Sequence, residues 1–342
     1  MNLINKKDNI FGDEIAFVEQ YDFSTANMSE ENRVKAITNV ASICYQNPKA
    51  VGSESLYNRL LAESKGLPSS SFEFVPVLFD MYDNNHIKII ENLSAMSNTL
   101  KYGERINNRY ILTNYRALIY DFEQTKEKID KIYGHRTPEE QKEFESIIKK
   151  YEDMFLKFYN TQEDCKIIKQ HFKVFNYKVD LPTRSQMVRH RVSWQELSRR
   201  YVSGERVPFE FYVSNKMGNV TSTAEKEIWF EKDDGSESTR TGIFNQTTQS
   251  IIDDCLAHYK QALADGVKPQ EARRIIPQCA YTQFWGAFMP KQLDNYFKLR
   301  LDSTAQYEVR KTAEAMQELI EKENTNGIWN YNLWKRGCGK DT

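Results

Sequence analysis

The chain of 342 residues has few of the residues that build metal sites, disulfide frameworks or low-complexity tracts. Its five cysteines and five histidines never fall in a CxxC, HxxxH or HExxH spacing, which argues against a zinc site and against a disulfide framework. Only 14 glycines and 9 prolines argue against a collagen-like or disordered chain. No apolar run approaches the roughly 18–20 residues that span a bilayer, and the amino terminus has no secretory apolar stretch. We therefore expect a cytoplasmic protein with reduced thiols, without a metal site or a membrane segment.

Net charge is also nearly absent. The 47 lysines and arginines oppose 48 aspartates and glutamates, which leaves a formal net charge of −1. This balance argues against a general nucleic-acid coat protein and against an acidic tail, but it does not exclude a local basic pocket. Hydrophobic residues are plentiful at 40%, with 19 tyrosines and 19 phenylalanines, which is enough for a sizeable core.

Helical and extended patterns alternate along the chain. Apolar residues at helical spacing predict two helices within residues 30–65 and another over 138–158. Strand-like apolar runs fall at 72–79 and 171–180, and the glycine-containing stretch 230–242 predicts a hairpin or an exposed loop. Strands in the middle with helices around them predict an α+β domain.

The segment 183–206 has the most unusual composition, because it contains no lysine and only two acidic residues. Its arginines are Arg184, Arg189, Arg191, Arg199, Arg200 and Arg206. Arginine binds phosphate or carboxylate in a bidentate manner and stacks on flat rings, which lysine does poorly. In a neutral chain this cluster suggests a fixed anionic ligand. Thr183, after a proline, is placed to cap a helix that would run to Arg191.

Two alternatives to a small anionic ligand stay open at this point. The arginines could form a solvated helical face that pairs with distant carboxylates. They could also serve a nucleic-acid-binding module that stacks bases on Trp194 or Tyr201, although the near-zero net charge counts against it. A steep salt dependence of oligonucleotide binding would favour the second alternative.

Two downstream segments carry further polar side chains on apolar frames. Arg273 precedes Pro277 by four residues, and the helical stretch 293–311 carries Asn295 and Arg300. Each segment taken alone has a local explanation, such as a helix cap, a nearby ion pair or a solvent-exposed face.

Together these segments resemble the flavin-dependent thymidylate synthases, the ThyX family. The family signature is an RHR triplet followed by a serine in the context S-x-N-E-x-S-x-R-Y. Here residues 189–191 (RHR) are followed by 193–201 (SWQELSRRY), with Ser198 as the matching serine. Gln186 fits the family's Q-x-x-R-H-R pattern.

Further blocks extend the resemblance in both directions. Residues 271–277 (EARRIIP) are similar to the family's E-A-R-x-x-L-P element, and 295–308 are similar to N-F-x-x-L-R-x-D-x-x-A-Q-x-E. Upstream, residues 41–45 and 72–73 look like the first helix and the start of the first core strand. The blocks occur in one order across about residues 33–323, which makes them far more specific than the triplet alone.

The resemblance implies a fold and an assembly. It implies one α+β domain over residues 1–342, with a central, mostly antiparallel sheet flanked by helices and an insertion at about 80–165. Within the insertion, residues 108–121 resemble a strand–helix piece of longer relatives. In the family the active site lies between the subunits of a homotetramer, so we expect self-association and neither a nucleic-acid nor a membrane partner.

The resemblance also implies a reaction, the reductive methylation of dUMP to dTMP. Methylenetetrahydrofolate would donate the carbon and FAD, reduced by NADPH, the hydride. Contacts to FAD are then expected from Ser70, Arg189, His190, Arg191, Glu196 and Asn295. Contacts to dUMP are expected from Gln186 of the neighbouring subunit and from Arg189, Glu196, Leu197, Ser198, Arg199, Arg200, Arg273 and Arg300.

Two of these residues have roles that their chemistry constrains. Arg300 would be the catalytic residue at the uracil edge, where a fixed cation stabilises the electron-rich ring. Ser198 lies between arginine-rich stretches without a paired His–Asp arrangement, which favours phosphate binding over a nucleophilic role.

The sequence departs from the family pattern at three places. Only six residues separate Arg191 from Ser198, where the family has seven. Pro68 stands where the family often has histidine, a role that His135 could take instead, and Met289 stands where it often has an asparagine that contacts the flavin. Because a fold does not by itself determine the reaction, a flavin-dependent dUMP hydroxymethylase is the alternative function.

Overall fold

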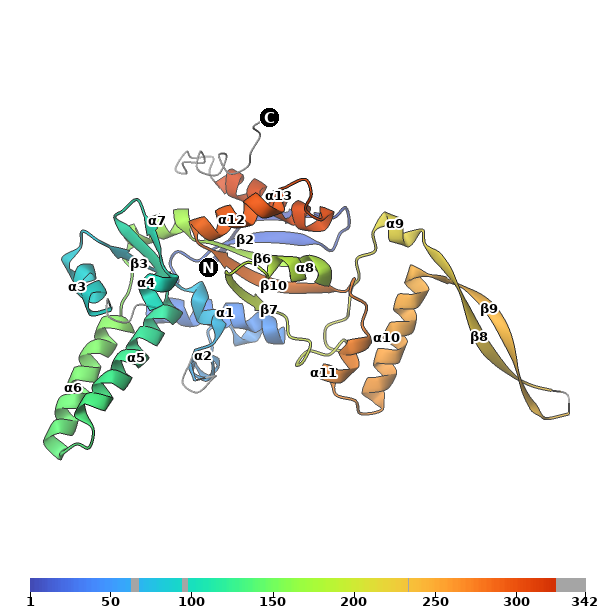
Figure 1. Cartoon of the computed structure of the whole chain (residues 1–342), viewed down its shortest axis with the longest axis horizontal. Coiled ribbons are helices and arrows are strands. Elements are labelled where there is room, and N and C mark those ends of the chain that lie inside the picture. Colours follow the sequence, from blue (N-terminus) through green and yellow to red (C-terminus); the bar gives the residue numbers. More distant parts are fainter. Residues whose placement is uncertain (63–67, 94–97, 233, 324–342) are drawn as a thin grey trace. The chain divides into compact units, whose positions relative to one another are not determined.

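The computed structural model describes residues 1–62, 68–93, 98–232 and 234–323 (Figure 1). Within these ranges, none of the helices combines the length and the apolar character that a membrane crossing requires. The chain forms two compact units. The first comprises Met1–Val179, Thr183–Leu197 and the chain from Gln283 on, and the second comprises Asp180–Pro182 and Ser198–Thr282.

A five-stranded sheet is the centre of the first unit. Its strand order is β1 (Asn2–Asp8), β2 (Phe17–Asp22), β6 (Lys173–Asp180), β10 (Tyr281–Phe288) and β7 (Ser193–Glu196). The pairs β1–β2, β2–β6 and β10–β7 are antiparallel. The predicted strand at 171–180 is β6, and the expected α+β fold with a central, mostly antiparallel sheet is confirmed.

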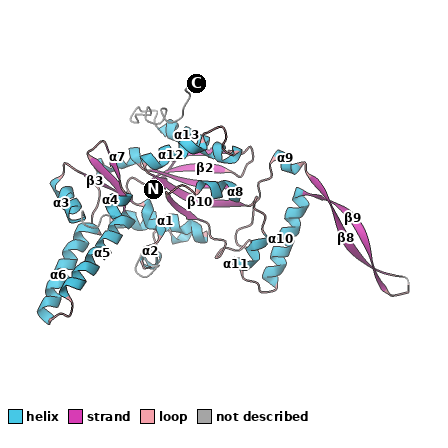
Figure 2. Cartoon of the chain, in the orientation of Figure 1, coloured by secondary structure: helices cyan, strands magenta, loops and turns pink. Residues whose placement is uncertain are grey.

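Helices cover both faces of this sheet (Figure 2). The helices α12 (Pro290–Arg300) and α13 (Tyr307–Glu323) lie on one face, and α1 (Glu30–Tyr45) lies on the other (Figure 1). On the first face the hydroxyl of Tyr177 in β6 donates a hydrogen bond to Sδ of Met316 in α13, at 3.4 Å. The sheet therefore has helices on both faces, and its strands β6 and β10 are almost entirely buried.

The core on the α1 face joins distant parts of the sequence. Ile37 and Val40 of α1 belong to one cluster of buried residues with Val174 of β6 and with Trp285 and Ala287 of β10. Each of the isoleucine and valine side chains contributes about 1.5–3 kcal/mol through burial of its apolar surface. A second helix, α2, follows α1 at Glu54–Leu61, so both helices predicted within residues 30–65 are confirmed.

Two strands of the predicted insertion form a small sheet with a strand that lies almost entirely before it. Its strand order is β3 (Pro76–Asp80), β5 (Tyr110–Asn114) and β4 (Glu104–Ile106), with antiparallel pairing throughout. The short helix α4 (Asn98–Tyr102) precedes β4, and α5 (Tyr115–Tyr133) follows β5 directly. The predicted change from strand to helix near residues 108–121 is therefore confirmed.

The rest of this segment is helical. It contains α3 (Asn84–Leu93), α6 (Pro138–Phe155) and α7 (Gln162–His171). The helices α5 and α6 form a hairpin, and Thr137 begins α6 with a capping box in which the side chains of Thr137 and Glu140 each bind the other residue's backbone N–H. The helix predicted over 138–158 is α6.

A local hydrogen bond changes the start of one predicted strand. Residues Ser70–Phe74 form a 3₁₀ helix, and β3 begins only at Pro76, so the prediction of a strand from residue 72 is wrong. The Ser69 side chain accepts the N–H of Ser71 at the start of this turn. A serine that binds nearby backbone offers the chain an alternative to sheet pairing.

The helix before the arginine triplet also differs from the prediction. Helix α8 spans Leu181–Met187, so Thr183 lies inside it instead of capping it, and the helix ends before Arg191. Proline is tolerated in the first helical turn, where the backbone N–H has no intrahelical partner, and Pro182 occupies that turn. The RHR triplet therefore lies in the connection between α8 and β7.

The second unit contains a long two-stranded hairpin. Strands β8 (Thr221–Glu231) and β9 (Glu237–Thr247) pair antiparallel along their full length, which confirms and extends the hairpin predicted at 230–242. The other helices of this unit are α9 (Asn215–Gly218), α10 (Thr248–Ala264) and α11 (Pro269–Ala272).

Candidate active site

The RHR triplet is held by its backbone, which leaves two guanidinium groups exposed. The N–H of His190 donates to the carbonyl of Met187 at 3.1 Å, and Nε1 of Trp194 donates to the carbonyl of His190 at 3.0 Å. His190 is buried, whereas Arg189 and Arg191 are exposed. Neither arginine has an ion-pair partner in the described part of the chain. Both are therefore free to bind an anion.

Trp194 can hold this turn only because β10 has a glycine opposite it. Gly286 pairs with Trp194 across the β10–β7 ladder. A Cβ atom on Gly286 would lie 2.5 Å from the Trp194 ring and 3.1 Å from the ring of Tyr177. The glycine thus permits the close packing that fixes the indole, and with it the carbonyl of His190.

Arg300, the last residue of α12, reaches the triplet. Its Nε donates to Nε2 of His190 at 2.8 Å, and its Nη2 donates to the carbonyl of Gln186 at 2.9 Å. Burial, together with the charge of Arg300, lowers the pKa of His190 from 6.5 to about 4. His190 is therefore neutral near pH 7 and acts as the acceptor that orients Arg300.

Glu196 is oriented by an arginine to which the sequence analysis assigned no role. Arg184 on α8 donates Nε to Oε2 of Glu196 at 2.6 Å and Nη2 to Oε1, which makes a bidentate ion pair. Arg184 belongs to the arginine cluster of the sequence, but its distance from Glu196 along the chain does not predict that the two side chains form an ion pair. The pair connects α8 to the end of β7.

Ser70 is tied to the same strand. Its hydroxyl donates to Oε1 of Gln195 in β7, and Nε2 of Gln195 donates to Sγ of Cys44 at 2.7 Å. Ser70 is thereby brought next to the strand that follows the triplet. Gln195 and Cys44 are further positioning residues that sequence reasoning did not single out.

The remaining predicted residues of the first unit have varied surroundings. Asn295 is exposed on α12, and Leu197 is buried with its N–H donated to the carbonyl of Gln283 at 2.9 Å. Nε2 of Gln186 donates to Oε1 of Gln306. On α12, Nε2 of Gln292 donates to the carbonyl of Arg191 at 3.1 Å, so this helix contacts the second and third residues of the triplet.

In the second unit, Ser198 begins a tight turn, since its carbonyl accepts the N–H groups of Tyr201 and Val202. The Arg199 guanidinium lies 4.1 Å from the centre of the Phe209 ring and donates to the carbonyl of Val207 at 2.5 Å. Part of the hydrogen-bonding capacity of Arg199 is therefore used to hold its own loop.

The other two predicted arginines of this unit are more accessible. Arg200 is exposed. Arg273 is exposed as well, and its Nε donates to the carbonyl of Gln270 at 3.3 Å. Neither has a carboxylate partner among residues that the structure describes, so both are free to bind an anionic group.

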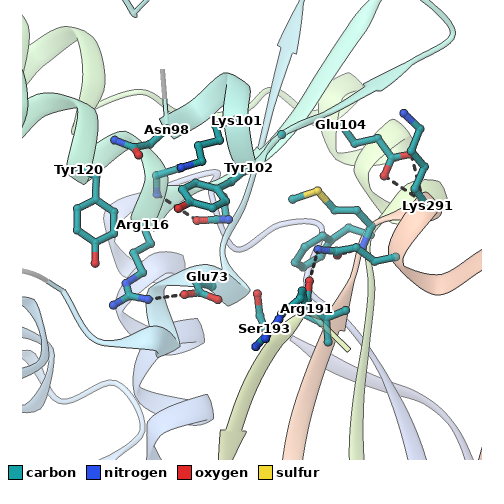
Figure 3. A pocket seen from close by; sticks show the side chains of 18 of the residues that line it. Glu73, Asn98, Lys101, Tyr102, Glu104, Arg116, Tyr120, Arg191, Ser193 and Lys291 are labelled. Carbon is teal, nitrogen blue, oxygen red and sulfur yellow. Dashed lines mark hydrogen bonds and ion pairs between the residues drawn. The ribbon is translucent and has the colours of Figure 1, made fainter. Parts of the chain in front are cut away.

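A pocket of about 780 Å³ lies beside Arg191 in the first unit (Figure 3). Part of its lining comes from α4, β4 and α5 of the predicted insertion, and part from β7 and from the start of α12. The charged residues that line it are Glu73, Lys101, Glu104, Arg116, Arg191 and Lys291.

Arg116 occupies the neighbourhood of Pro68, the position where the related family often has histidine. Its Nε donates to the carbonyl of Pro68 at 2.9 Å, and its Nη1 forms an ion pair with Glu73. His135, the candidate replacement, is exposed in the connection between α5 and α6 and is not among the pocket residues. The guanidinium group of Arg116, from α5, thus lies beside Pro68, the position at which this sequence lacks the histidine.

Met289 belongs to the buried hydrophobic core. It is buried at the start of α12, and its backbone N–H donates to Oε1 of Gln292 at 2.9 Å.

In the described ranges, no three His, Cys, Asp or Glu side chains are grouped so that they could hold a metal ion.

The sequence profile of one protein family matches this chain. The family is described as thymidylate synthase complementing protein, and the match covers residues 121–324. It includes α8, the triplet, β7, β10 and α12, which carry most of the predicted site. It begins inside the segment predicted as an insertion.

Individual proteins that are similar to this chain are named flavin-dependent thymidylate synthases. The chain is 29% identical over 150 residues to the flavin-dependent thymidylate synthase of Aquifex aeolicus, covering 44% of this chain and 45% of that protein. It is 32% identical over 144 residues to the enzyme of that name from Thermosipho africanus, covering 41% of this chain and 60% of that one. The corresponding protein of Thermosipho melanesiensis is 29% identical over 153 residues, covering 44% and 63%. The chain thus spans less than two thirds of the length of these relatives.

Proposed function

Because this chain belongs to the thymidylate synthase complementing protein family, the family of the flavin-dependent thymidylate synthases, we propose that it converts dUMP to dTMP. Methylenetetrahydrofolate donates the carbon and leaves as tetrahydrofolate. Bound FAD supplies the hydride that completes the methyl group and is reduced again by NADPH. The observation that supports this proposal most is the hydrogen bond from Arg300 to His190, which fixes a cation beside the RHR triplet.

Arg300 is the residue to which we assign the stabilisation of the pyrimidine. Two of its N–H groups are donated to His190 and to the carbonyl of Gln186, which leaves further donors on the same rigid fork. Since His190 is neutral, it orients the guanidinium without adding a second positive charge. A cation held in this way stabilises negative charge that develops on the uracil ring during the reaction.

The donors that would hold FAD fit an anionic cofactor. The exposed guanidinium groups of Arg189 and Arg191 have no carboxylate partner in the described ranges, and arginine forks suit a pyrophosphate. We assign His190, Ser70, Asn295 and Glu196 to the same cofactor. Glu196 would present a carboxylate whose orientation the ion pair with Arg184 fixes.

We assign dUMP to the segment from Leu197 to Arg200 and to Gln186, Arg273 and Arg300, with Arg189 and Glu196 shared with FAD. Ser198 and Arg200 would bind the phosphate, and Arg273 would add a further contact. Arg199 would act largely by holding the loop, because the carbonyl of Val207 already takes one of its donors. Gln186 would act on the nucleotide of a neighbouring subunit, which requires self-association, and we propose a homotetramer.

The test is a spectrum and a product analysis on the purified protein. We expect a yellow protein whose flavin absorption changes when dUMP is added, and which forms dTMP from dUMP, methylenetetrahydrofolate and NADPH. Absence of flavin binding, or turnover without flavin, would contradict the proposal.

The same assay separates methylation from hydroxymethylation. The six-residue spacer before Ser198 and the replacement of a family histidine by Pro68 are the observations that favour the hydroxymethylated product. Mass spectrometry distinguishes it from dTMP, because it is heavier by one oxygen atom.

A further inference from the structure

The residues at the start of α12 are poorly suited to capping this helix. Met289, which precedes it, has no side-chain oxygen, and Pro290, its first residue, has no backbone N–H. Lys291 therefore carries the first backbone N–H within the helix, and the regular helical pattern is established at Leu293, whose N–H donates to the carbonyl of Met289 at 3.0 Å. The N–H of Lys291 needs an acceptor from another part of the fold.

Glu104, the first residue of β4, supplies this acceptor (Figure 3). Its Oε1 and Oε2 accept the backbone N–H of Lys291 at 3.2 and 3.0 Å, and the two residues are 187 positions apart in the sequence. A carboxylate at this end of a helix also interacts favourably with the positive end of the helix dipole. Glu104 thus caps α12 in place of a local side chain.

The segment that carries Glu104 is firmly held. Glu104 pairs with Leu112 in the β4–β5 ladder. A Cβ atom on Gly103 would lie 2.5 Å from the carbonyl oxygen of Thr99, so the end of α4 packs closely against the start of the strand. Asp121 is fully buried, and its carboxylate accepts the backbone N–H of Thr99 at 2.9 Å, which holds α4 against α5. The cap therefore comes from an ordered part of the molecule.

The capped turn is connected to the RHR triplet by one amide side chain. Gln292 follows Lys291 in the first turn of α12, and its Oε1 accepts the N–H of Met289 at 2.9 Å. Its Nε2 donates to the carbonyl of Arg191 at 3.1 Å. Because both ends of this amide are engaged, the place of the Arg191 carbonyl depends on the turn that Glu104 caps.

The cap and the helix have different relations to the family. The family match covers residues 121–324, which include the triplet and α12, and it begins after Glu104. Glu104 belongs to the segment that was predicted as an insertion. The family assignment therefore accounts for α12 and does not account for the group that caps it.

We propose that Glu104 is a positioning residue of the candidate site, which holds the first turn of α12 and, through Gln292, the backbone of Arg191. Its effect on the cofactor rests on the proposed function, because that is where Arg191 is assigned to FAD. Its effect on the backbone of the triplet does not depend on that assignment.

Hydrogen–deuterium exchange of the full-length protein tests the effect on the backbone. Glu104→Ala should speed exchange at least about fivefold in segments 187–194 and 289–293, and Glu104→Gln, which keeps one acceptor, should speed it less. Exchange in β6 should not change, whereas a general loss of stability would speed it as well. The matched control is Glu127→Ala, an exposed glutamate on α5. Wild-type exchange at the triplet in Glu104→Ala, or equally faster exchange in β6, would overturn the inference.

Flavin titration of the same variants tests the effect on the cofactor. The Glu104→Ala protein should bind FAD about tenfold more weakly than the Glu127→Ala protein, because its Arg191 is no longer preorganised, and Glu104→Gln should recover part of the affinity. Thermal midpoints verify that each variant is folded. Unchanged FAD affinity in Glu104→Ala would overturn the role in cofactor binding. A wild-type protein that binds no FAD would instead refute the proposed function, and the exchange result would still decide whether Glu104 holds the triplet.

Discussion

At the residue scale, the charge of the candidate site depends on a histidine whose imidazole is neutral. His190 is buried, accepts a hydrogen bond from Arg300, and packs edge-on against the ring of Tyr296 at 4.8 Å. Protonation would place a second positive charge beside the guanidinium. The arrangement therefore works only while the imidazole is neutral.

This state makes the stability of the protein depend on pH. The pKa of His190 is lowered from 6.5 to about 4, so between these values the unfolded chain binds a proton that the folded protein excludes. The lowered pKa of His190 therefore adds at most about 3 kcal/mol to the free energy of unfolding. This contribution is present in full above pH 6.5 and is lost as the pH falls towards 4. We expect urea unfolding to show a smaller loss between pH 7 and pH 4.5 for His190→Gln, whose side chain can accept from Arg300 but does not titrate. Equal losses in both proteins would contradict this account.

Two arginines of the site should fail in different ways when they are removed. Arg300→Ala should lower turnover about 10²–10³-fold, because a preorganised cation is lost where charge develops, while the flavin colour is retained. Arg191→Ala should instead lose flavin, since its exposed guanidinium is assigned to the cofactor. Absorption spectra and steady-state rates check both, with thermal midpoints to verify folding. Wild-type rates in both variants would show that the assignment of the site is wrong.

At the element scale, the site depends on how closely β10 and β7 pack. The Trp194 indole lies over Gly286 and holds the carbonyl of His190, so the strand pair and the triplet form one structural unit. This contact involves residues 92 positions apart in the sequence, and hydrophobic periodicity does not reveal such pairs.

Gly286→Ala should therefore reduce both stability and activity. The new Cβ atom would lie 2.5 Å from Trp194, and such overpacking costs about 1–3 kcal/mol. Gly218→Ala is the matched control, because its nearest neighbour would be at the ordinary contact distance of 3.8 Å. Denaturant midpoints of the two variants measure the difference, and equal midpoints would exclude a structural role for the glycine.

The elements that the sequence predicted correctly are those with strong local signals. The amphipathic stripe at 138–158 and the apolar run at 171–180 became α6 and β6. The errors occurred where a single side chain or a proline shifted a boundary, as at Ser69 before the 3₁₀ helix and at Pro182 inside α8. Such boundaries depend on individual hydrogen bonds that periodicity does not report.

At the scale of the whole molecule, one domain over residues 1–342 stays a prediction. The last residue of β6 and the first two residues of β10 belong to the second unit, so the chain of each strand continues from one unit into the other. We therefore expect a single unfolding transition, with the calorimetric enthalpy equal to the van't Hoff enthalpy. Two separate transitions would show that the units are independent domains.

The proposed assembly makes a prediction that does not depend on seeing the interface. If each site combines Gln186 of one subunit with Arg300 of another, mixed tetramers of Gln186→Ala and Arg300→Ala contain some complete sites. Random mixing should restore about a quarter of wild-type turnover, whereas each variant alone is impaired. Light scattering should give a tetramer for every sample. Failure to recover activity on mixing would refute shared sites.

The sequence by itself determined the family, the α+β class and the identity of most candidate residues. These follow from short ordered blocks, local periodicity and a concentration of arginine within a neutral chain. Contacts between distant segments were decided only by the tertiary structure: Arg300 donating to His190, Arg184 pairing with Glu196, and Arg116 lying at Pro68 and Glu73. The physical reason is that hydrogen bonds and ion pairs depend on distances of about 3 Å between side chains, which residue spacing along the chain does not specify.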